Sequence, residues 1–111
     1  MTAASSAVLL DLNNPEFLKS LFALEKNDKI QLFKQLEKIS KLAWVDVQRD
    51  PSLKWEKIHP IPVLLQRYLL DGKIRTLYSI RLTQAKRAVV LREGDYMRFL
   101  ALPRDHDSTY A

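Results

Sequence analysis

Residues 74–102 read IRTLYSIRLTQAKRAVVLREGDYMRFLAL, and this stretch decides the fold that we expect. From Ile74 the side chains alternate with a period of two, which is the pattern of a β-strand. Two further strands are expected at residues 87–92 and 96–102, and Glu93-Gly94-Asp95 between them is typical of a compact hairpin. The stretch therefore predicts three consecutive antiparallel strands, a β-meander.

Ahead of this stretch, the sequence predicts one more strand and a first helix. Residues 7–12 form a short apolar run that favours a strand. Asn14 is expected to cap a helix that has Pro15 at its first position and Glu16 near its positive end. An apolar stripe supports this helix, formed by Phe17, Leu21 and Leu24.

A second helix is expected to follow after a few residues. Asp28 and Gln31 resemble a capping pair at its start. Its apolar stripe is Leu32, Leu36, Ile39 and Ala43. The short connection predicts an antiparallel helical hairpin on one face of a sheet of about four strands, so the fold class is α+β. Residues 1–6 are expected to be disordered and residues 7–111 to form a single domain, in which 44–73 resists assignment.

The composition excludes several classes of protein. The chain has no cysteine, so disulfides and thiolate metal sites are excluded. Its two histidines, His59 and His106, show no metal-ligand spacing, and we expect neither a metal nor a cofactor. No apolar run approaches the length of a membrane span, and no basic residue precedes the apolar run at the N-terminus. We therefore expect a cytoplasmic protein with no membrane partner.

The positive charge of the chain is concentrated in its second half. Residues 1–50 carry equal numbers of basic and acidic side chains, so the whole net charge of +5 falls in residues 51–111. A basic half beside a neutral half indicates a surface that binds a polyanion. The alternative is an ordinary contribution of charge to solubility.

Three arginines are candidates for that surface. Arg81 lies near the end of one expected strand and Arg87 near the start of the next, so their side chains should be close, and Arg104 follows the last strand. We expect the basic residues on the sheet face opposite the core and at the edges of the sheet. Guanidinium groups are always charged and bind two phosphate oxygens at once. The alternative for Arg81 and Arg87 is a surface ion pair with Glu93 or Asp95, which contributes little energy.

The end of the chain, RDHDSTY at residues 104–110, supplies groups for acid–base chemistry. RNA is cleaved without a metal when a base takes the proton of the 2′-hydroxyl, an acid protonates the leaving 5′-oxygen and cations stabilise the phosphorane. His106 is suited to proton transfer near neutrality, and Tyr110 to stacking on a base. The alternatives are an exposed tail for His106 and a place against the core for Tyr110.

The sequence resembles the RelE/ParE superfamily of bacterial toxin–antitoxin toxins, because its motifs follow one another in the order that is common in that family. The likeness rests on Leu53-Lys54, Tyr78-Ser79-Ile80-Arg81, KRAVV at residues 86–90 and the closing RDHDSTY. It covers residues 7–110, nearly the whole chain. The sequence departs from the family pattern where Val90-Leu91 replaces the usual aromatic residue, and at residues 59–73, a segment longer than is typical.

The resemblance implies a metal-independent endoribonuclease that cleaves mRNA on the ribosome and is neutralised by a cognate antitoxin. Arg87 and Arg104 would contact the scissile phosphate and stabilise its developing charge. His106 would act as acid or base, and Tyr110 would stack on or polarise the nucleotide at the cut. The implied RNA-binding residues are Lys54, Arg81 and Lys86. Two alternatives stay open, namely a ParE-like inhibitor of DNA gyrase on the same fold, which the closing set disfavours, and an RNA-binding module without catalysis.

Overall fold

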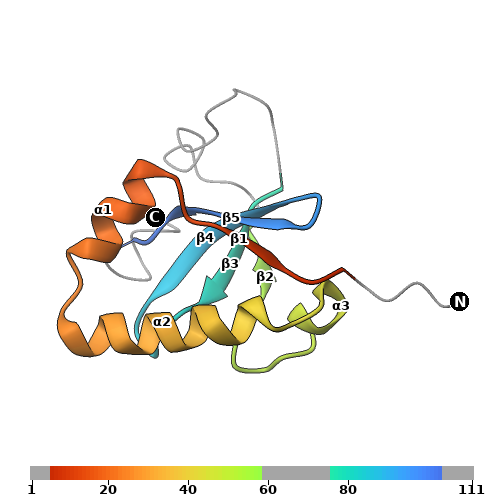
Figure 1. The fold of residues 1–111 in the computed structure, drawn as a ribbon, viewed down its shortest axis with the longest axis horizontal. Helices are drawn as coiled ribbons and strands as arrows, with labels where there is room; N and C mark the ends of the chain where they lie inside the picture. Colours follow the sequence, from red (N-terminus) through yellow and green to blue (C-terminus); the bar gives the residue numbers. More distant parts are fainter. Residues whose placement is uncertain (1–5, 59–75, 104–111) are drawn as a thin grey trace, which may run out of the picture.

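The computed structural model of the chain describes residues 6–58 and 76–103, which form an α+β domain with a five-stranded mixed sheet (Figure 1). The strands lie in the order β1-β5-β4-β3-β2. Their bounds are β1 Leu9–Asp11, β2 Glu56–Lys57, β3 Tyr78–Arg81, β4 Arg87–Glu93 and β5 Tyr96–Ala101. The helices are α1 Pro15–Phe22, α2 Lys26–Ser40 and α3 Trp44–Val47. The predicted α+β class is confirmed, but the sheet has five strands where the sequence predicted about four.

Most strand pairs are antiparallel, and one edge pair is parallel. β2 pairs with β3, β3 with β4 and β4 with β5 in antiparallel fashion, whereas β1 runs parallel to β5. β4 and β5 fall where the sequence predicted them, and Gly94 has φ +61° in the turn between them. Among the described residues β3 begins at Tyr78, while Ile74, where the pattern starts, lies outside them. β2 and α3 fall in the stretch that the sequence left unassigned.

The first helix begins as its sequence predicts. The Asn14 side chain accepts a hydrogen bond of 2.9 Å from the backbone N–H of Glu16, and Pro15 occupies the first position. This satisfies one of the free N–H groups that every helix start leaves.

The second helix differs from its prediction at both ends. It begins at Lys26 with Glu25 before it and no side-chain cap, so the Asp28–Gln31 capping pair is wrong. It ends at Ser40, so Ala43 does not belong to its apolar stripe. Ala43 is extended instead, because it forms a β-bridge with Ala7. This contact with the distant N-terminal segment ends the helix before its apolar pattern does.

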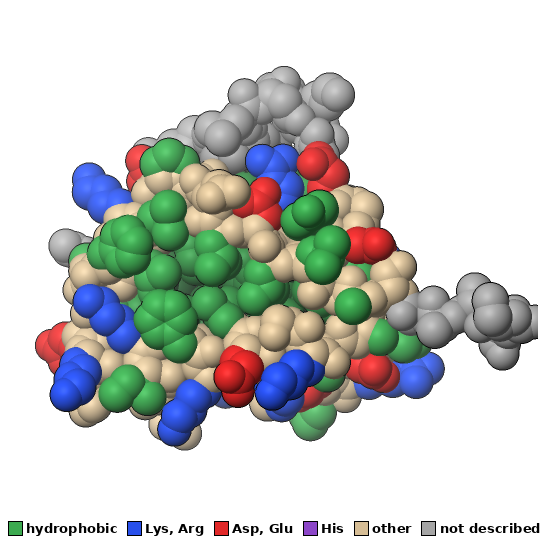
Figure 2. Space-filling model, in the orientation of Figure 1, with side chains coloured by type: hydrophobic (Ala, Val, Ile, Leu, Met, Phe, Trp, Pro, Cys, Tyr) green, Lys and Arg blue, Asp and Glu red, His purple; other side chains and the backbone are tan. Residues whose placement is uncertain are grey.

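The helices cover one face of the sheet and build the main core there. Phe17 and Leu21 of α1 and Leu32, Leu36 and Ile39 of α2 pack with Ile80, Ala88, Val90, Met97 and Phe99 of the sheet. The rings of Phe17 and Phe99 lie 5.2 Å apart. Figure 2 shows hydrophobic side chains gathered in a hollow between α1 and α2. Phe22 on α1 and Phe33 on α2 remain 67% and 52% exposed.

The opposite face of the sheet is also apolar, which corrects the expectation that the basic residues occupy a polar face. A second buried cluster lies there, formed by Ile58, Leu77, Val89, Leu91, Leu100 and Ala101. In β4 four consecutive residues, 88–91, are buried, because successive side chains of a strand point to opposite faces and both faces are apolar. The arginines of this face therefore border an apolar surface.

Candidate anion-binding site

Arg81 and Arg87 lie directly opposite each other at the end of the β3–β4 ladder. Residues opposite each other on antiparallel strands point to the same face, with their Cβ atoms about 5 Å apart. Since Ile80 and Ala88 face the helices, both arginines face the second apolar cluster. The predicted proximity of the two arginines is confirmed.

The Arg87 guanidinium group is fixed by contacts with Lys54 and Glu56. Arg87 donates from Nη2 to the carbonyl oxygen of Lys54 at 2.8 Å, and the same nitrogen lies 3.4 Å from Oε2 of Glu56. Because β3 lies between β4 and β2, the Arg87 side chain must cross β3 to make these contacts. Its side chain is only 14% exposed, so its position is well defined.

The ion pairs predicted as alternatives for these arginines are not the ones found. Arg87 pairs with Glu56 of β2. Glu93 lies 3.5 Å from Arg98, which also contacts Asp11 at 3.3 Å. Glu93 thus pairs with a different arginine, and Glu56 compensates only part of the charge of the Arg81–Arg87 pair.

The segment that holds Arg87 also contacts Arg81 through its backbone. The backbone N–H of Arg81 donates to the carbonyl oxygen of Leu53 at 2.7 Å, and Leu53 is fully buried. The next residue, Lys54, has φ +51°, a left-handed conformation that is uncommon outside glycine. Its carbonyl oxygen is the one that accepts from Arg87. Residues 53 and 54 therefore present consecutive carbonyl groups to the two arginines.

Three polar atoms on this face are buried without a hydrogen-bond partner: Nε of Arg81, Nε of Arg87 and Oγ of Ser79. Within the described ranges 6–58 and 76–103, Nε of Arg81 finds no hydrogen-bond acceptor. An unsatisfied buried donor costs about 1–3 kcal/mol, and like charges opposite each other on a ladder repel. A phosphate placed between the arginines would accept hydrogen bonds from the unsatisfied donors, because its oxygens accept several charge-assisted hydrogen bonds. Its negative charge would also offset the repulsion between the two guanidinium groups.

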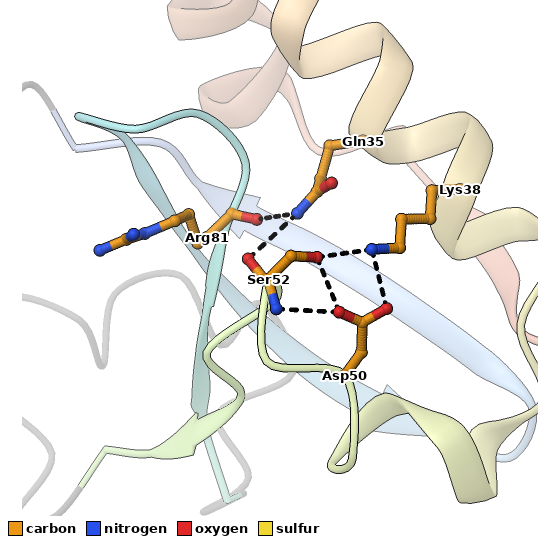
Figure 3. Close-up of polar contacts among 5 residues, drawn as sticks. All are labelled: Gln35, Lys38, Asp50, Ser52 and Arg81. Carbon is orange, nitrogen blue, oxygen red and sulfur yellow. Dashed lines mark hydrogen bonds and ion pairs between the residues drawn. The ribbon is translucent and has the colours of Figure 1, made fainter.

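Helix α2 contacts the same backbone from the other face of the sheet (Figure 3). The side-chain amide of Gln35 donates to the carbonyl oxygens of Arg81 at 3.0 Å and Ser52 at 3.4 Å. Lys38 lies 2.9 Å from Oδ2 of Asp50 and donates to Oγ of Ser52 at 2.6 Å. Asp50 also accepts from the backbone N–H of Ser52. The connection between α3 and β2 is thereby fastened to α2.

Asp50 is held in its charged form. Burial by itself would raise the pKa of this carboxyl group, but hydrogen bonds from Lys38 and Ser52 outweigh burial and lower the pKa below its usual value. The carboxylate therefore accepts these hydrogen bonds at neutral pH.

Sequence reasoning missed Gln35, Lys38, Asp50, Ser52 and Glu56. No local motif marks them, since Gln35 meets the Arg81 carbonyl across 46 residues of chain and Lys38 meets Ser52 across 14. Only the strand alternation that placed Arg81 near Arg87 carried a sequence signal.

The remaining predicted residues are distributed as follows. The Lys54 side chain is exposed, and Lys86 is partly buried just before β4. Arg104, His106 and Tyr110 lie outside the described residues.

In the part of the chain that is described, no group of three or more His, Asp or Glu side chains could hold a metal ion. None of the described helices is both long and apolar enough to cross a bilayer.

Searches of protein families, curated proteins and solved structures find no match to this chain.

Proposed function

We propose that this protein is the toxin of a type II toxin–antitoxin system, a RelE-like endoribonuclease that cleaves mRNA on the ribosome without a metal ion. The observation that carries the proposal is the opposed pair Arg81 and Arg87, whose buried Nε atoms lack partners at the edge of an apolar sheet face. A second support is the concentration of the net charge in residues 51–111. The order of the elements, with a strand and two helices ahead of antiparallel strands, agrees with a RelE-like arrangement.

In the proposed reaction, the 2′-hydroxyl of RNA attacks the adjacent phosphorus. The bond to the 5′-oxygen breaks, leaving a 2′,3′-cyclic phosphate and a free 5′-hydroxyl. Negative charge builds on the phosphorane oxygens, and this is the charge that Arg81 and Arg87 would stabilise. Lys54 and Lys86 would bind neighbouring phosphates, where single positive charges suffice.

The closing segment would supply proton transfer and substrate positioning. His106 would act as acid or base, Arg104 would contribute a further positive charge and Tyr110 would stack on the nucleotide at the cut. These three roles rest on the family resemblance.

A cognate antitoxin would neutralise the toxin by covering the sheet and helices and by covering or distorting the basic site. The hydrophobic patch that Figure 2 shows between α1 and α2 supports such a partner, because contiguous exposed apolar surface on a small protein commonly marks a protein-binding site. Phe22 on α1 and Phe33 on α2 are largely exposed.

The test is cleavage of mRNA in translating ribosomes in the presence of EDTA, followed by mapping of the new RNA ends. We expect cuts in the ribosomal A site with cyclic phosphate ends. Arg87→Met and Tyr110→Phe should each slow the reaction at least about tenfold, since one lost transition-state contact costs a few kcal/mol. Lys41→Met is the control, because the Lys41 side chain is exposed and forms an ion pair with Glu37 of α2.

Three outcomes contradict the proposal. Inhibition of gyrase supercoiling without RNA cleavage would assign the chain to the ParE-like alternative. Salt-dependent RNA binding without cleavage would make it a binding module. Equal cleavage rates in wild type and both site variants would remove these residues from the reaction.

A further inference from the structure

We propose that Gln35 is a positioning residue for the Arg81–Arg87 site, which it holds from the opposite face of the sheet. This inference rests on the proposed anion-binding role of the two arginines. Figure 3 shows that the Arg81 side chain points away from α2, whereas its carbonyl group faces Gln35. The residue therefore acts through the backbone and does not touch the anion itself.

Gln35 donates hydrogen bonds to two separate segments of the backbone. One amide nitrogen lies 3.0 Å from the carbonyl oxygen of Arg81 and 3.4 Å from that of Ser52. The first belongs to the last residue of β3, and the second lies two residues before Lys54, whose carbonyl group anchors Arg87. Beside the backbone hydrogen bond from Arg81 to Leu53, a single side chain thus adds a second link between the backbone that presents Arg81 and the backbone that holds Arg87.

The neighbouring lysine supports the same arrangement. Lys38 lies one helical turn after Gln35, so both side chains project from the same side of α2. Lys38 contacts Asp50 and Ser52, and Asp50 accepts hydrogen bonds from Ser52 through its backbone N–H and its hydroxyl group. The position of Ser52 is therefore held from both sides, which keeps its carbonyl oxygen within reach of Gln35.

Gln35 also has room to be changed without strain. It lines a hollow of about 390 Å³ between α2 and the β3–β4 connection, together with Lys34, Thr83 and Gln84. Methionine has nearly the same length and shape as glutamine but no donor. Gln35→Met therefore removes the hydrogen bonds and leaves the packing nearly unchanged.

The experiment measures binding of a trinucleotide RNA with 2′-O-methyl riboses, which has no free 2′-hydroxyl and cannot be cleaved. We expect Gln35→Met to weaken binding about tenfold, because small displacements of positioned groups have effects of this size or larger. Ser40→Ala is the matched control, since it removes a side-chain hydrogen bond to the Glu37 carbonyl on the same helix, away from the site. It should bind like wild type.

Two readouts separate positioning from general stability. In the Arg81→Lys background, which keeps a positive charge, Gln35→Met should weaken binding much less than it does alone, because a lysine on its flexible stem makes no two-pronged contact that depends on an exact backbone position. The Nε–H resonances of Arg81 and Arg87 in 15N–1H spectra should shift in Gln35→Met and stay in place in Ser40→Ala. If Gln35→Met fails to fold, Gln35→Asn keeps the amide but shortens its reach by one methylene, and the same results are expected.

The outcomes distinguish this inference from the proposed function. Wild-type affinity and unshifted Arg signals in Gln35→Met, with binding lost in Arg81→Met, would overturn the positioning role and leave the RNA site intact. No binding by wild type, with shifted Arg signals in Gln35→Met, would overturn the RNA-binding function and retain the positioning. Equal effects of Gln35→Met in both backgrounds would reduce Gln35 to a stabilising contact.

Discussion

Replacing Arg81 with methionine should make the protein more stable while it abolishes anion binding. The substitution keeps an unbranched apolar stem but removes a buried Nε that has no partner and a charge directly opposite Arg87. Most substitutions of partly buried residues destabilise a fold, so the expected sign is unusual. Residues that serve a function often cost stability, so a gain on replacing Arg81 is expected if the pair has such a role.

The magnitude follows from these two contributions. An unsatisfied buried donor costs about 1–3 kcal/mol, and like charges opposite each other on a ladder add up to about 1 kcal/mol. Since Arg81 is only partly buried, we expect a net gain of about 1–3 kcal/mol in the free energy of unfolding. For 111 residues the unfolding entropy is about 0.23 kcal/mol/K, so Tm should rise by about 4–13 °C.

Arg87→Met provides the internal comparison. This substitution also removes a buried Nε without a partner, but it deprives the Lys54 carbonyl and Glu56 of their contacts. Its Tm should therefore lie below that of Arg81→Met, although both variants lose the same charge.

Calorimetry in a buffer free of phosphate and sulfate measures both effects. Pyrophosphate at about ten times its Kd should stabilise the wild type by about 1.4 kcal/mol and leave Arg81→Met unaffected. A Tm for Arg81→Met below that of wild type would refute the reasoning. Equal stabilisation of wild type and variant by pyrophosphate would show that the anion binds elsewhere.

Three further predictions concern the fold. Phe99→Ala removes the buried ring that packs on Phe17 and should lower the free energy of unfolding by about 3–5 kcal/mol in urea titrations. The pKa of Asp50 is lowered in the folded state, so its contribution to stability is present above the unfolded value of about 3.8 and is lost as pH falls through the folded value. Asp50→Asn should therefore lose less stability than wild type as the pH is lowered from about 5 to about 3 in urea titrations. Gly94→Ala meets no atom within 4 Å but must adopt φ +61°, and thermal unfolding should show a loss of about 1 kcal/mol.

Local signals predicted the elements that local chemistry controls. Asn14 and Pro15 marked the start of α1, and the turn around Gly94 marked the β4–β5 hairpin, because a helix start and a tight turn each satisfy their own backbone within a few residues. The end of α2 was missed, since it is set by the bridge between Ala43 and the distant Ala7.

The candidate site divides in the same way. By itself, the sequence determined that Arg81 and Arg87 would be neighbours on one face, because a strand alternates its side chains and a short connection returns the chain beside itself. Only the tertiary structure decided which groups hold them. Gln35 and Glu56 come from separate parts of the chain, and hydrogen bonds and ion pairs between such segments depend on distances that folding alone creates.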